Sequence, residues 1–225
     1  LYCKKLKMMN MKKNKFKILS IGVMGLLISS CTVMSNYQSA KTIGKGSIEG
    51  TALYTNYSWT EESMREDDDD AFKYNSIGIQ GAYGITDKFD AGLRYELVLS
   101  EEYNVSHFAL SGKYNIVENL LSVYMPIGMY FGEDMDVGET FHMRPTLLGN
   151  IDINDNIELT PSLGYALAFN SDYNSYLQVG FGSGIKLGSV DALTFRPEIG
   201  LSFNGENAGK EMIFNAGLGI LYRLK

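Results

Sequence analysis

The chain has 225 residues, with 20 Lys and Arg against 26 Asp and Glu, and a formal net charge of −6. Seven of the lysines fall within residues 1–30, so the rest of the chain carries 13 basic and 26 acidic residues. A surface this acidic excludes nucleic acid as the main partner, because binding to phosphates needs clustered Lys and Arg. The 24 Gly, 15 Tyr and 11 Phe favour a β protein over a helical one.

Residues 1–30 have the pattern of a secretory signal peptide, and we expect Met11 to be the true start. From Met11 the sequence reads MKKNKFK and then ILSIGVMGLLISS. A basic stretch, a short apolar run and small residues before a cleavage site define such a peptide. The apolar run is shorter than the roughly 20 residues that a transmembrane helix needs.

The four residues Ile28–Cys31 resemble the lipobox of bacterial lipoproteins, with an aliphatic residue, two small residues and a cysteine. The resemblance implies that the Cys31 thiol carries a diacylglycerol and that the new N-terminus is acylated, commonly by palmitate. An ordinary signal peptide with an incidental cysteine is the alternative. Cys3 lies in the segment that would be removed, which leaves no disulfide and no cysteine-based metal site.

Residues 31–44 are polar and without pattern, and we interpret them as a lipid-anchored tether. Residues 45–225 form a second region, in which apolar and polar residues alternate, as in Leu193–Asn204. Alternation places the two sets on opposite faces of a strand. The pattern predicts ten strands, at 46–59, 73–84, 89–99, 105–114, 119–131, 140–151, 157–169, 175–187, 192–203 and 212–224.

Short and long connections alternate along this region. The short ones are at 85–88, 116–118, 153–156 and 189–191, and the longer, more acidic ones at 61–72, 100–104, 132–139, 170–174 and 205–211. With an even number of strands, all the short turns and both ends of the region then lie at one end of the sheet. Outer-membrane barrels have this arrangement, with short turns in the periplasm and longer loops outside.

One face of the predicted strands is apolar and the other is rich in glycine. The apolar face includes Leu93, Leu97, Ile127, Leu163 and Phe214. Glycine and other small residues suit a crowded lumen better than a solvated surface, so we expect the apolar face to contact lipid. Four prolines, Pro126, Pro145, Pro161 and Pro197, lie within strands, where each removes a hydrogen-bond donor and implies an irregularity.

Over nearly all of this region the chain resembles the small bacterial outer-membrane β-barrel (porin-like) family. ITDKFDAGLRY at 85–95 and the closing FNAGLGILYRLK are typical of it, although the chain ends on Lys225 where these barrels often end on an aromatic residue. The resemblance implies an all-β, transmembrane, antiparallel up-and-down barrel of about ten strands, with eight or twelve as alternatives. It also implies a bacterial outer-membrane location with both termini in the periplasm and a lipid anchor at Cys31.

Charged residues of both signs fall on the inward face, and we expect them to form a lumen charge network or to line a pore. Barrels of about eight strands have filled lumens, whereas 16–18 strands leave a water channel, so ten strands favour a filled lumen. A paired network that closes the interior and a narrow charge-lined pore both stay open. The residues are Arg94, Glu96, Lys113, Arg144, Glu158, Lys186, Arg196, Glu198 and Arg223.

The first long connection carries the acidic run Asp67, Asp68, Asp69 and Asp70. Clustered carboxylates can bind divalent cations, but the run lacks the spaced ligands and the turn glycine of a calcium loop. We interpret it as a solvated charge run, with cation binding as the alternative. We expect no protein-bound metal and no cofactor.

No enzyme motif stands out, and we expect the chain not to be an enzyme. The leading hypothesis is a porin-like or structural surface component of the outer membrane, with a narrow channel for small solutes as one version. The alternative is a hydrolase at the barrel rim, of lipase or protease type, using His107 and His142. Expected partners are outer-membrane lipid, lipopolysaccharide and the barrel-assembly machinery, with small solutes or divalent cations as further ligands.

Overall fold

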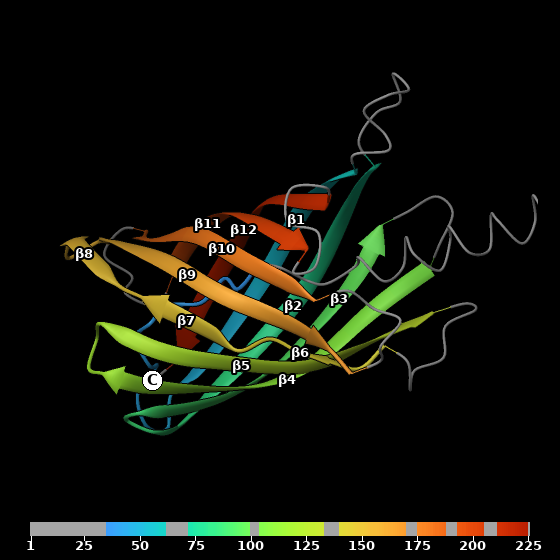
Figure 1. The fold of residues 1–225 in the computed structure, drawn as a ribbon. Helices are drawn as coiled ribbons and strands as arrows, with labels where there is room; N and C mark the ends of the chain where they lie inside the picture. The colour runs from blue at the N-terminus through green and yellow to red at the C-terminus, as the bar shows by residue number, and fades with distance from the viewer. Residues whose placement is uncertain are drawn as a thin grey trace, which may run out of the picture. The chain divides into compact units, whose positions relative to one another are not determined.

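The computed structural model describes residues 35–61, 72–99, 104–132, 140–169, 175–187, 193–204 and 211–224. This part of the chain is all-β (Figure 1). The strands are β1 (Ile48–Glu61), β2 (Phe72–Thr86), β3 (Phe89–Leu99), β4 (Asn104–Val117), β5 (Leu121–Gly132), β6 (His142–Met143), β7 (Thr146–Gly149), β8 (Ile151–Asn154), β9 (Ile157–Ala168), β10 (Tyr176–Lys186), β11 (Leu193–Asn204) and β12 (Glu211–Leu224).

The strands close into a ten-stranded antiparallel barrel, as the sequence predicted. The three short strands β6, β7 and β8 share one position in the wall, between β5 and β9. Each other strand pairs with its neighbours in the chain, and β12 pairs with β1 over the whole of both strands, from Ile48↔Leu224 to Glu61↔Glu211. Closure removes the free edges that an open sheet would expose.

The two faces of the wall follow the alternation in the sequence. On β3, for example, the inward residues Asp90, Arg94 and Glu96 are buried, whereas Leu93 and Leu97 point outward and are exposed. The other long strands show the same distribution. The buried residues of the barrel are largely polar, and many of the exposed ones are large and apolar. The predicted division of the strands into an apolar outer face and a small or polar inner face is confirmed.

The sixth wall position is interrupted between β6 and β7, at Arg144 and Pro145. Proline has no N–H to donate to a ladder, so an irregularity at this point was expected. Two backbone hydrogen bonds of 3.0 Å connect this interruption to the neighbouring strands. Arg144 N donates to the Pro126 carbonyl of β5, and Tyr165 N of β9 donates to the Pro145 carbonyl. The barrel therefore stays closed where the strand is broken.

The short turns at 87–88, 118–120 and 155–156 lie at one end of the barrel together with the last residues of β12, which we call the turn end. In Figure 1 the turn between β4 and β5, β8 and the C-terminus mark this end on the left. Within the described ranges, no helix is long and apolar enough to cross a membrane.

Candidate functional site

The lumen is occupied by the chain itself. Residues 35–44, which we call the lumen segment, precede β1, and the side chains of Ser35–Ala40 and Ile43 are all buried. The sequence predicted a tether over 31–44, and its described part instead runs inside the barrel. Ser35 lies beside Thr55 and Tyr57, in the half of β1 away from the turn end. The segment thus runs along the lumen toward the turn end.

Two arginines hold the first residues of the lumen segment. Arg94 of β3 donates from Nη1 to the Ser35 carbonyl at 2.6 Å and from Nη2 to the Ser35 hydroxyl at 3.1 Å. Arg144 donates from Nη2 to the Asn36 side-chain oxygen at 2.9 Å. Arg94 also pairs with Glu96, its neighbour on the same face of β3. A buried guanidinium needs such partners, because desolvation without them is costly.

A carboxylate on the opposite wall binds the next two residues. Glu198 of β11 accepts the backbone N–H of Asn36 at Oε1, 2.6 Å away, and that of Tyr37 at Oε2, 2.7 Å away. Both carboxylate oxygens therefore satisfy amides that could not reach water inside the barrel. Bonds of this charge-assisted kind are stronger than those between neutral groups.

Tyr37 fixes the segment against the seam between β1 and β12. Its hydroxyl lies 2.7 Å from the Thr55 hydroxyl and donates to the Tyr54 carbonyl at 2.9 Å. The ring packs beside Gly217 and Gly219 of β12, where a larger side chain would collide with it. Burial raises the pKa of the Tyr37 hydroxyl, which stays protonated and keeps its role as a donor. The glycines on this strand make room for the lumen segment.

The middle of the segment is held through its carbonyl groups. Asn115 donates to the Ala40 carbonyl at 3.1 Å, and the Ser122 hydroxyl donates to the same oxygen. Lys113 donates to the Lys41 carbonyl at 2.8 Å and forms an ion pair with Asp90, 3.1 Å away. A segment with no strand partner must satisfy its backbone groups in this way.

The segment leaves the lumen through a reversal at Gly44 and Gly46. Both glycines have positive φ, +87° and +79°, which residues with a Cβ rarely adopt. Gly46 N donates to the Gly84 carbonyl at 2.8 Å, and Gly84 N donates to the Ser47 carbonyl at 3.0 Å. These bonds join the reversal to β2 and set the start of β1.

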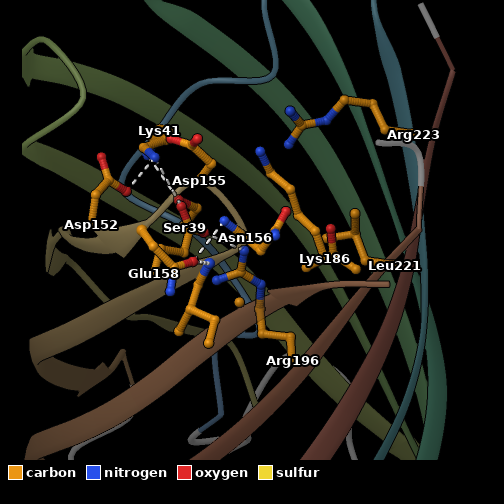
Figure 2. Close-up of a pocket in the computed structure, with 14 residues that line it drawn as sticks. Ser39, Lys41, Asp152, Asp155, Asn156, Glu158, Lys186, Arg196, Leu221 and Arg223 are labelled. Carbon is orange, nitrogen blue, oxygen red and sulfur yellow. Dashed lines mark hydrogen bonds and ion pairs between the residues drawn. The ribbon is translucent and has the colours of Figure 1, made fainter. Parts of the chain in front are cut away.

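A cavity of about 520 Å³ lies near the turn end, lined by the lumen segment and by β8–β12 (Figure 2). Lys41 bridges two carboxylates there, Asp152 at 2.5 Å and Glu158 at 3.2 Å, and Arg196 binds Glu158 at 2.6 Å. Desolvation lowers the pKa of the Lys41 ammonium, but the hydrogen bonds and charges of Asp152 and Glu158 outweigh it and raise that pKa above its ordinary value.

The structure brings most of the predicted lumen charges to the lumen segment. Arg94, Lys113, Arg144, Arg196 and Glu198 each bond to it directly, with Arg196 donating to the Gln38 carbonyl at 3.3 Å. The other predicted charges lie beside this set. Arg223 pairs with Glu49 on β1, and Lys186 is exposed at the rim of the cavity.

His107 and His142 are the histidines considered for a rim hydrolase. They lie on β4 and β6, the two strands that flank β5, and their rings face each other. Their Nε2 atoms are 3.2 Å apart, and His142 Nδ1 lies 3.1 Å from the Thr140 carbonyl. The Tyr130 ring stacks on the His142 ring and lies tilted against the His107 ring. Within the described part of the chain, each histidine is thus the hydrogen-bond partner of the other. The predicted sites at Cys31 and at Asp67, Asp68, Asp69 and Asp70 lie outside the described residues.

Sequence reasoning missed the residues of the lumen segment, among them Ser35, Asn36, Tyr37 and Gln38. The signal that could have found them was the small inward face, because Gly84 and Gly217 leave space that something must fill. An ideal Cβ on Gly84 would overlap the backbone of Gly44. Read in this way, the glycines predict a chain segment packed against the wall, in addition to crowded side chains.

No protein-family model matches the chain, and no curated protein matches it. Solved structures similar to it are β-barrels. The N-terminal barrel domain of Pseudomonas aeruginosa OprF is 14% identical, with coverage of 80% of this chain and 99% of that chain and a TM-score of 0.38. The COG4313 outer membrane channel of Pseudomonas putida F1 is 10% identical, with 84% and 100% covered and a TM-score of 0.45. The translocator domain of the autotransporter NalP from Neisseria meningitidis is 9% identical, with 96% and 95% covered and a TM-score of 0.47.

Proposed function

We propose that the chain is an outer-membrane β-barrel that its own N-terminal segment keeps closed. In this role it is a structural or surface component of the membrane, and it passes small solutes only when the lumen segment is displaced. The observation that carries the proposal is the burial of residues 35–40 inside a closed barrel, held by bonds to walls on both sides.

The outer face supports a membrane setting. Large apolar residues point outward along the strands, such as Ile79 at 61% exposure, Leu110 at 58% and Ile199 at 53%. A continuous apolar exterior of this kind is not found on monomeric proteins in water. The long strands have 11 to 15 residues, enough for a tilted strand to cross the hydrocarbon core, which takes about 9–11. Lipid and lipopolysaccharide are then the direct contacts of this face, and the barrel-assembly machinery inserts it.

Conductance in planar bilayers tests the closed state. The full chain should give no single-channel steps, and a variant lacking residues 35–43 but keeping the Gly44–Gly46 reversal should give steps. Heat-modifiable migration on a detergent gel controls for folding of both proteins. Steps from the full chain would contradict closure by the segment, and a folded but silent deletion variant would contradict the solute pathway.

A lipid on Cys31 is the second part of the proposal. It is supported by the residues Ile28–Cys31 alone. It is constrained by the lumen segment, because the four residue-to-residue steps from Cys31 to Ser35 span at most about 14 Å when extended. Intact-mass measurement of the full chain and of Cys31→Ser tests it. The acyl mass should be present in the first and absent from the second, and equal masses apart from the substitution would remove the anchor from the proposal.

A further inference from the structure

The histidine pair has the geometry of two ligands to one metal ion. His107 and His142 are the only histidines of the chain, and their Nε2 atoms are 3.2 Å apart. Two imidazole nitrogens at 2.0–2.1 Å from a tetrahedral metal ion would be separated by about 3.3 Å. The present separation therefore admits an ion between the rings after only a small adjustment.

The ring orientation of His142 also fits the binding of a metal ion at Nε2. Its Nδ1 lies 3.1 Å from the Thr140 carbonyl, so Nδ1 carries the proton and donates it. The lone pair of Nε2 is then free to accept. Histidines that bind metals commonly hold the other ring nitrogen on a carbonyl or carboxylate in this way.

Among the described residues, neither His107 Nδ1 nor Glu96 Oε2 has a hydrogen-bond partner, and both atoms are buried. Glu96 and His107 are directly opposite each other on β3 and β4 and both face inward. With His142 Nε2 as acceptor, the proton of His107 now lies on Nε2, which leaves its Nδ1 and the Glu96 oxygen unsatisfied. If a metal ion took the Nε2 position, the His107 proton would move to Nδ1, and Nδ1–H could donate a hydrogen bond to Glu96.

Charges of both signs lie around the histidine pair. Arg94 and Arg144 are the cations that act on His107, and Glu96 and Glu198 are the carboxylates that act on these arginines. Among the described residues, no cluster of three or more His, Cys, Asp and Glu could hold a metal. The protein therefore offers two ligands, and the remaining positions would belong to water or to a small external ligand.

We propose that His107 and His142 bind one divalent transition-metal ion of the class that prefers imidazole, such as Cu²⁺ or Zn²⁺, through their two Nε2 atoms. Glu96 acts as a positioning residue that accepts a hydrogen bond from the His107 Nδ1–H. Binding exchanges one tautomer of His107 for the other and changes no net protonation. The proposal does not rest on channel activity, and it connects to the lumen segment through Arg94, which binds both Glu96 and Ser35.

Electron paramagnetic resonance of Cu²⁺ tests the site in the full chain, folded in detergent without a histidine tag. One Cu²⁺ per chain should bind, with superhyperfine coupling to two nitrogens, whether the metal is added before or after refolding. His107→Ala and His142→Ala should each lose that two-nitrogen signal, and equimolar Zn²⁺ should compete for it. A two-nitrogen signal that survives in the double variant, or its absence from the native chain, would overturn the proposal.

Two further variants separate the site from the fold. Glu96→Gln should keep the two-nitrogen coupling but weaken Cu²⁺ binding about 10- to 100-fold, as removal of outer-shell partners does. Gln80→Ala alters a buried polar residue on β2 and should leave the affinity unchanged. Equal losses in both variants would assign the effect to folding and contradict the role of Glu96. Gel migration identifies the folded fraction of each variant. If His142→Ala fails to fold, His142→Gln takes its place.

Discussion

The hydroxyl of Tyr37 occupies the space that a side chain on Gly217 would need. Tyr37 belongs to the lumen segment and Gly217 to the last strand, and an ideal Cβ on residue 217 would overlap the tyrosine oxygen and approach the Tyr54 carbonyl to 2.5 Å. The same oxygen bonds to Thr55 on β1, directly opposite Gly217. One tyrosine thus lies across the seam at which the barrel closes.

Gly217→Ala should therefore destabilise the barrel. The methyl group must displace the Tyr37 hydroxyl and press on the backbone of β1, and overpacking of this kind costs about 1–3 kcal/mol. The free energy of unfolding in urea, measured in detergent, reports the change. Gly50→Ala, at an outward position with nothing within 4 Å of the new atom, is the matched control and should have little effect.

A double-mutant cycle then isolates the contact. In a Tyr37→Ala background, Gly217→Ala should cost less than in the native chain, because one of its two collisions has been removed. Additive effects of the two substitutions would contradict contact between these residues.

Glu198→Ala should loosen the start of the lumen segment. The change leaves the amides of Asn36 and Tyr37 without an acceptor, and each buried unsatisfied group costs about 1–3 kcal/mol. Hydrogen exchange at these two amides should accelerate. Glu198→Gln can still accept one of the two bonds and should fall between the native chain and Glu198→Ala. Glu118→Ala, in an exposed turn, should change nothing, and unchanged exchange in Glu198→Ala would refute the contact.

Lys41→Met should weaken the turn end of the segment only slightly. The Lys41 side chain is 31% exposed and its partner Asp152 is 53% exposed, so water and salt screen the pair, and a loss of about 1 kcal/mol or less is expected. The pKa of Lys41 is raised by folding, so its stabilisation is fully present at neutral pH and is lost as the pH rises through that raised pKa in the alkaline range. The difference between native and variant stability should shrink in high salt and at alkaline pH. Lys45→Met, at an exposed lysine of the same region, is the control and should show neither dependence.

Ile79→Arg tests the apolar exterior. Ile79 points outward near the middle of β2, and an arginine at mid-bilayer depth on the outer face of a barrel costs about 2–4 kcal/mol. The fraction folded into lipid vesicles should fall, as seen by heat-modifiable migration. Thr86→Arg, at the exposed turn end, should fold as well as the native chain. Equal folding of both variants, with release into the soluble fraction, would argue against a membrane-facing wall.

The barrel wall was predictable because one face of every strand must be apolar and the other small or polar. Apolar and small or polar residues therefore alternate with a period of two in the sequence. The bounds of the predicted strands at 89–99 and 212–224 agree with those of β3 and β12 to within one residue. The predicted strand at 140–151 contains β6 and β7 but only the first residue of β8, which extends into the predicted connection at 153–156. Its proline predicted an irregularity, but the division into three depends on pairing with β5 and β9, which no local pattern encodes.

The contents of the lumen were not predictable in the same way. Residues 35–44 have no periodicity, because they are placed by wall residues far away in the sequence, such as Glu198 for Asn36 and Arg94 for Ser35. The inward charges were identified from the alternation, but their partners were not. Charges of balanced sign predict mutual pairing as readily as they predict a peptide held between them.

Because Tyr37 lies across the closing seam, it distinguishes correct from shifted pairing of β1 with β12. In the observed register Thr55 lies opposite Gly217, Tyr57 opposite Asn215 and Leu53 opposite Gly219. A slip of two residues would leave every side chain on the same face of the strand. Burial of apolar and polar residues would therefore not distinguish this register from the observed one. A slip that brought Asn215 opposite Thr55 would fill the space of the tyrosine ring and expel the segment. The contact between Tyr37 and Gly217 therefore fits the observed register of β1 and β12 and does not fit this shifted one.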